Sequence, residues 1–134
     1  MARNLLPAVL LVVIACGGAS SRAQFSSTRP IPETIDCLST ALDSAGYKVI
    51  RADRRRGQLE GRREGAAPAQ RTDLTEYKRG DRLEIDAATD KTSYTIVPSS
   101  YIETRSQVGP RTEYGAASAT GEADAAFFGK RCGS

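Results

Sequence analysis

The chain has 134 residues, of which 40% are hydrophobic and 26% charged, with three cysteines and no histidine or tryptophan. These values indicate a single globular domain, since a disordered chain would have fewer apolar residues and a disulfide-held miniprotein more cysteines. The absence of histidine excludes Ser-His-Asp and Cys-His catalysis and zinc sites that need imidazole. A formal net charge of +3 favours no particular partner.

The first segment is typical of a secretory signal. Arg3 precedes an apolar run from Leu5 to Ala15 that only Pro7 interrupts. This run is too short to cross a bilayer core of about 30 Å, which needs roughly 20 apolar residues. We therefore assign residues 1–15 to a signal peptide.

The end of this segment, Val13-Ile14-Ala15-Cys16, resembles the lipobox of bacterial lipoproteins. The resemblance implies cleavage after Ala15, a diacylglycerol on the Cys16 thiol and a further acyl chain, such as palmitate, on the new amino group. One acyl chain anchors only marginally, whereas two or three hold a protein stably. Gly17 resembles the residue that follows this cysteine in lipoproteins passed on to the outer membrane. In a Gram-negative host, the resemblance therefore implies an outer-membrane lipoprotein that faces the periplasm.

Ordinary secretion is the alternative. Ser21-Arg22-Ala23 is an acceptable small-x-small cleavage site, although it lies well beyond the apolar run. Cleavage after Ala23 would discard Cys16 and release a soluble protein.

Cys37 and Cys132 remain once Cys16 is lipidated or removed. Export places both in an oxidising compartment, where they can form one intramolecular disulfide across a loop of about 95 residues. No Cys-x-x-Cys arrangement supports a redox-active pair. We therefore expect a structural disulfide.

Composition divides the mature chain into a tether and a domain. Residues 16–30 are rich in Gly, Ser, Ala, Thr and Pro and predict a flexible, lipid-anchored tether. A helix is predicted over 33–45, because Ile35, Leu38 and Leu42 recur at helical spacing. A second helix is predicted over 121–131, with Ala123, Ala126, Phe127 and Lys130 on one side.

The residues between these helices favour antiparallel β-structure. Alternation of apolar and charged residues around Leu83 and Ile85 is typical of a strand with one buried face. We expect Pro98 to lie at an edge, a bulge or a break, because it cannot donate a ladder hydrogen bond. The strands are expected within 47–52, 58–62, 83–87, 93–105 and 111–116. Residues 31–134 are thus predicted to form a single α+β domain, an antiparallel sheet of four to five strands with both terminal helices on one face.

The densest basic cluster surrounds a predicted hairpin turn. Arg54, Arg55 and Arg56 are consecutive, and other arginines flank them. A solvated turn that discourages sheet-to-sheet aggregation is the simplest interpretation. Contact with an anionic lipid surface is the functional alternative, and no nucleic acid is expected, because no aromatic residues are interleaved with the charges.

No group in the sequence predicts catalysis. Glu84 and Asp86 lie on one face of a predicted strand near Asp81 and Asp90, but an exposed strand face accounts for them. We expect neither an enzyme nor a cofactor or metal site. The expected function is a non-catalytic binding or scaffolding module in the cell envelope, held by the lipid on Cys16 and contacting an envelope protein or an anionic lipid surface. The alternative is a soluble, secreted domain that binds a small ligand.

Overall fold

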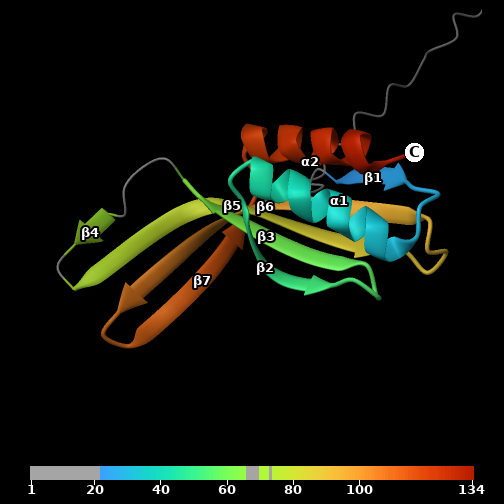
Figure 1. Ribbon diagram of the computed structural model, residues 1–134. Helices are drawn as coiled ribbons and strands as arrows, with labels where there is room; N and C mark the ends of the chain where they lie inside the picture. Colours follow the sequence, from blue (N-terminus) through green and yellow to red (C-terminus); the bar gives the residue numbers. More distant parts are fainter. Residues whose placement is uncertain (1–21, 66–69, 73) are drawn as a thin grey trace, which may run out of the picture.

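The computed structural model describes residues 22–65, 70–72 and 74–134 (Figure 1). These residues form two helices and seven strands in an α+β arrangement. The elements in chain order are β1 (Ala23–Ser26), α1 (Ile31–Ser44), β2 (Lys48–Asp53), β3 (Gln58–Glu64), β4 (Gln70–Thr72), β5 (Thr75–Ala87), β6 (Ser93–Ser106), β7 (Gly109–Gly115) and α2 (Ala119–Cys132).

The strands form one antiparallel sheet built on the long pair β5 and β6. Over one half of the sheet the order is β1-β6-β5-β3-β2. Over the other half, β4 pairs with the start of β5 and β7 pairs with the end of β6. This second half extends past the helices as a projection (Figure 1), here called the arm.

Both helices lie on the same face of the sheet (Figure 1). α1 contacts β2 and β3, whereas α2 contacts β1, β6 and β5. The core between the helices and the sheet is filled by large side chains. Its fully or nearly fully buried members include Ile35, Leu38, Leu42, Tyr47, Leu59, Leu83, Ile85, Tyr94, Ile96 and Phe128. No helix of the described residues lies on the opposite face of the sheet (Figure 1).

Local signals set the ends of both helices. Pro32 and Glu33 lie in the first turn of α1, which ends before Gly46, whose φ of +86° favours glycine. Ser118 caps α2, because its Oγ accepts a hydrogen bond from the Gly121 amide at 3.0 Å. These helices match the predicted spans to within two residues at each end.

The predicted α+β class and antiparallel sheet are confirmed, but the predicted number of strands is wrong. The described residues contain seven strands, and their first element is a strand; β1 and β4 are the two strands that were not predicted. β1 lies inside the predicted tether, so the domain begins by Ala23 rather than at residue 31. Phe25 holds β1 in the domain, because its ring stacks on Tyr94 with centroids 5.0 Å apart.

Pro98 lies at a break, one of the positions expected for it. On one edge of β6, Ala23 of β1 pairs with Ile96 and Gly115 of β7 pairs with Ser100. Pro98 occupies the gap between these two partner strands, where no ladder hydrogen bond is needed.

Candidate functional site

The predicted lipid-attachment residue, Cys16, lies outside the described residues. Among the described residues, neither helix is long and apolar enough to cross a membrane. The first described residue, Arg22, is exposed and leads directly into β1 at the sheet edge.

The structure joins Cys37 to Cys132 in a disulfide, with Cα atoms 5.8 Å apart. Cys37 belongs to α1, and Cys132 is the last residue of α2 and is fully buried. The bond therefore clips the two helices together over the sheet.

Arg54, Arg55 and Arg56 form the turn between β2 and β3. Arg54 donates two hydrogen bonds to the Asp36 carboxylate of α1, at 2.9 and 2.6 Å. Asp53 accepts hydrogen bonds from the backbone amides of Arg55 and Arg56, and its Oδ2 atom lies 3.9 Å from Arg56 Nε. The turn is thus held by neighbouring carboxylates, and Arg54 already has an ionic partner.

A second charged group, which the sequence analysis did not single out, covers the helix-free face of the sheet. We call it the open-face cluster, and it consists of Arg51, Glu60, Arg62, Arg82, Glu84, Tyr101 and Tyr114. These side chains share one face because their positions alternate with Leu59, Leu83 and Ile85, which point to the helices.

Glu60 lies at the centre of the cluster. Arg82 donates a hydrogen bond to Glu60 Oε1, Arg62 lies 3.7 Å from the same oxygen, and Arg51 lies 4.0 Å from Oε2. Arg82 also pairs with Glu84 at 3.0 Å. These arginines leave Glu60 only 7% exposed on a face that no helix covers.

The tyrosines fix the guanidinium groups of the cluster. The Arg62 guanidinium lies 5.4 Å from the Tyr101 ring and 5.7 Å from the Tyr114 ring, and it donates a hydrogen bond to the Tyr114 hydroxyl at 2.6 Å. Arg82 lies 4.5 Å from the Tyr114 ring. Burial is the largest single influence on Arg82 and opposes its charge, but the hydrogen bond to Glu60 and the negative charges of Glu60 and Glu84 together outweigh burial and raise the pKa of Arg82. The cluster is therefore charged and held in place before any partner arrives.

A depression of about 440 Å³ adjoins the cluster where the β2–β3 pair meets the arm. Lys48 and Arg62 supply positive charge to its lining, and Glu64 and Glu103 supply negative charge. The Tyr101 ring and the half-exposed Ile50 provide its apolar surface. Such a lining suits a protein surface of mixed charge better than an apolar ligand.

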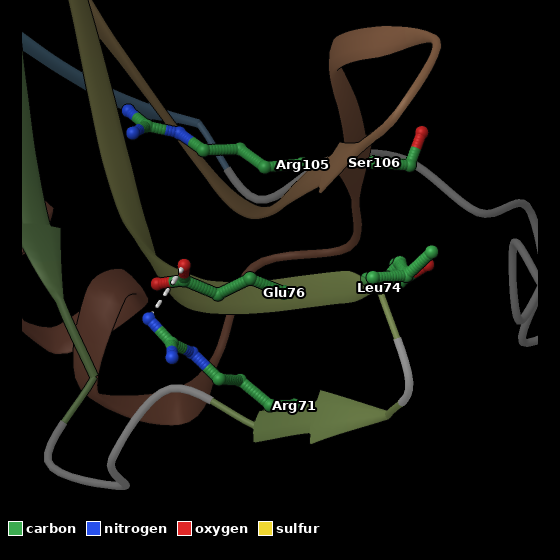
Figure 2. A pocket seen from close by; sticks show the side chains of 6 residues that line it. Arg71, Leu74, Glu76, Arg105 and Ser106 are labelled. Atoms are coloured by element: carbon green, nitrogen blue, oxygen red, sulfur yellow. Dashed lines mark ion pairs between the residues drawn. The ribbon is translucent and has the colours of Figure 1, made fainter.

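The arm carries a second depression, of about 330 Å³, between β4, β5 and β6 (Figure 2). Arg71 and Glu76 point toward each other and form an ion pair at 3.6 Å. Arg105 is paired with Glu103 at 3.0 Å, and Leu74 is 68% exposed at the rim. The charges here are satisfied by surface ion pairs, which contribute little energy.

A polar network lies on the helix side of the sheet. Arg63 donates to Asp81 Oδ2 at 3.1 Å and to Asp124 Oδ2 at 2.8 Å. Tyr47 donates to the same oxygen of Asp124 at 2.8 Å, and the Ser118 hydroxyl donates to Asp81 at 2.7 Å. Burial, reinforced by the hydrogen bond to Asp124, raises the pKa of Tyr47. This network ties α2 to the sheet.

Of the carboxylates considered for chemistry, Glu84 and Asp86 share the helix-free face of β5, as predicted, but Asp81 and Asp90 lie elsewhere. Asp81 faces the helices, whereas Glu84 belongs to the open-face cluster. Asp90 lies in the β5–β6 turn, where the amides of Thr92 and Ser93 lower its pKa to about 2. Within the part of the chain that the structure describes, no three Cys, Asp or Glu side chains gather as a metal site would require.

The sequence holds one signal for the open-face cluster. Glu60-Gly61-Arg62 and Arg82-Leu83-Glu84 place opposite charges two residues apart on neighbouring strands. Only the register of β3 against β5, which sets Glu60 opposite Glu84 and Arg62 opposite Arg82, brings the two pairs together. No known protein-family model matches this chain, and no curated protein is significantly similar to it.

Proposed function

We propose that this protein is a lipoprotein of the bacterial cell envelope, anchored through Cys16, whose open sheet face docks a partner protein without catalysis. The open-face cluster is the observation that carries the docking proposal. Arginine and tyrosine are the residues most enriched at the energetic centres of protein interfaces. Here their side chains are already ordered by one another, so binding would cost little conformational entropy.

The position of β1 favours cleavage after Ala15 over cleavage after Ala23. Ala23 is the first residue of β1, pairs with Ile96 and packs against the core. Cleavage after Ala23 would remove this residue and place a charged amino group within the strand. Cleavage after Ala15 leaves β1 intact, with Cys16 seven positions before Ala23.

The alternative is a secreted domain that binds a small ligand between the helices and the sheet. Tyr47, Tyr94 and Phe128 occupy this region with less than 3% exposure each. Their packing favours a docking module over a pocket protein.

Site-specific photocrosslinking in intact envelopes tests the docking proposal. A photoreactive phenylalanine would replace either Tyr114, which is 50% exposed in the cluster, or Phe127, which is 57% exposed on the opposite side. We expect one discrete protein adduct from position 114 and none from position 127. The position-114 adduct should disappear when Arg62→Ala is added.

The proposal would be contradicted if position 114 formed no protein adduct, or if Arg62→Ala left the adduct unchanged. The Arg62→Ala chain should keep a cooperative thermal transition, because Arg62 lies outside the core. A folded variant ensures that loss of the adduct reports on docking.

A further inference from the structure

The outer face of α2 is uncovered among the described residues and carries exposed alanine and phenylalanine side chains. Its inner side packs on the sheet through Ala125, Phe128 and Cys132. The predicted common side, with Ala123, Ala126, Phe127 and Lys130, instead faces outward and is exposed. Phe127 is the large apolar residue of this face.

Two cations extend this face. Lys130 and Arg131 occupy the last turn of α2 and are exposed, and neither has an ion-pair partner among the residues that the structure describes. The outer surface of α1 differs, because it carries the acidic residues Glu33 and Asp43, and its third carboxylate, Asp36, is paired with Arg54. An anionic surface would therefore be attracted to the last turn of α2 more strongly than to the outer surface of α1.

The chain enters the domain beside this same helix. β1 is an edge strand, and α2 packs on it closely enough that a Cβ on Gly129 would lie 3.3 Å from the Phe25 ring. Arg22, directly before β1, adds another exposed positive charge. The α2 edge is thus the side of the domain to which residues 16–22 attach.

The length of that attachment limits how far the domain can move from a lipid on Cys16. Seven residue steps separate Cys16 from Ala23, which span at most about 25 Å when fully extended. Such a short link holds the α2 edge at a high effective concentration near the bilayer. Even weak contacts between α2 and the lipid headgroups would then be formed most of the time.

We propose that the outer face of α2 rests on an anionic phospholipid surface, with Phe127 at the headgroup level and Lys130 and Arg131 against lipid phosphates. This inference rests on the Cys16 anchor of the proposed function. It directs the open-face cluster, which lies on the other side of the sheet, away from the membrane and toward a partner. An aromatic ring flanked by cations is the side-chain combination that membrane interfaces favour.

Tryptophan fluorescence measures this contact, because the chain has no tryptophan of its own. Phe127→Trp is compared with Val108→Trp, which replaces a residue 98% exposed at the tip of the arm. Cys37 and Cys132 are bonded to each other, so Cys16 is the remaining thiol and can be coupled to a maleimide phospholipid. Each chain, beginning at Cys16, is coupled in this way to vesicles rich in phosphatidylglycerol with brominated acyl chains.

We expect the emission of Phe127→Trp to shift to the blue and to be quenched by the bromines, and that of Val108→Trp to remain as in solution. Equal quenching at both positions, or quenching at Val108→Trp alone, would overturn the inference. Because the lipid is attached chemically, this result does not depend on lipidation in cells. If cells leave Cys16 without lipid but the coupled chain passes this test, the Cys16 anchor is refuted and the lipid contact of α2 still stands.

Charge neutralisation gives a second, independent measurement on the untethered Cys16→Ser chain. Lys130→Gln with Arg131→Gln should weaken binding to phosphatidylglycerol vesicles about fivefold per charge, or roughly 25-fold for the pair. The matched control, Arg55→Gln with Arg56→Gln at the β2–β3 turn, should weaken it less than about threefold. A larger loss from the turn than from α2 would overturn the inference and assign the lipid contact to Arg54, Arg55 and Arg56.

Discussion

The ring of Tyr101 lies directly over Gly80, its cross-strand neighbour in β5. A Cβ on Gly80 would approach the Tyr101 Cε1 atom to 2.7 Å and its hydroxyl oxygen to 2.6 Å, and it would also meet the Arg63 carbonyl. The missing side chain of Gly80 is therefore what lets Tyr101 lie flat against the sheet and support Arg62. This pair positions the open-face cluster at the point where the arm begins.

Gly80→Ala should destabilise the domain, because the new methyl group meets both a ring and a backbone carbonyl. We expect a loss of about 1–3 kcal/mol in the free energy of unfolding, measured by urea denaturation. Gly115→Ala is the matched control, since its Cβ would meet the Ser100 hydroxyl at 3.2 Å and no backbone atom. Equal stability of the two variants would contradict this explanation of Gly80.

Asp124→Ala should loosen the attachment of α2 to the sheet. The substitution removes the shared acceptor of Arg63 and Tyr47, so two partly buried donors lose a hydrogen bond. The expected cost is about 2 kcal/mol in the free energy of unfolding. Asp43→Ala, on the exposed side of α1, should change stability by less than about 0.5 kcal/mol. Equal free energies of unfolding for the two variants would show that the hydrogen bonds to Asp124 do not stabilise the domain.

The raised pKa of Tyr47 predicts a specific loss of stability at alkaline pH. In the unfolded chain the phenol ionises near its ordinary pKa of 10, whereas burial in the folded state keeps it protonated to higher pH. The stabilisation linked to this group is therefore complete below pH 10 and decreases as the pH rises above it. Denaturation curves recorded across this range should show a steeper decline for the wild-type chain than for Tyr47→Phe. Parallel declines would argue against a shifted pKa at Tyr47.

Loss of the disulfide should destabilise the whole domain, because it clips the two helices over the core. The double variant Cys37→Ser with Cys132→Ser avoids new pairings with Cys16. The bond closes a separation of 95 residues, for which the chain-entropy model predicts a loss of about 4 kcal/mol. Reductant should lower the melting temperature of the wild-type chain toward that of this variant and leave the variant unchanged. Identical melting of the wild-type chain with and without reductant would show that the bond does not stabilise it.

The features that could be predicted from the sequence are those with local patterns. Ile35, Leu38 and Leu42 repeat at helical spacing, and Leu83 and Ile85 alternate with charged residues, so α1 and the end of β5 were recognisable. β1 and β4 have only four and three residues and depend on pairing with distant strands. Residues 75–82, for which no strand was predicted, form the first part of β5, and its partners β4 and β6 are not visible in its composition.

The open-face cluster escaped prediction for a related physical reason. Charged residues on the outer face of a strand normally point into solvent, and nothing within β3 or β5 alone contradicts that interpretation. Glu60 is buried because the register places Arg82 of β5 diagonally opposite it. In addition, β7 places the Tyr114 ring against the guanidinium groups of Arg62 and Arg82. Long-range register of this kind has no signal in a single strand.

The central claim, anchorage through Cys16, is tested most directly by mass spectrometry of the mature N-terminus from a native bacterial host. We predict that the purified protein begins at Cys16 and carries a diacylglyceryl thioether with an acyl chain on its amino group. Cys16→Ala should abolish this modification and release the chain from the membrane fraction. A mature protein that begins at Gln24, without lipid, would contradict the anchor and favour a secreted domain.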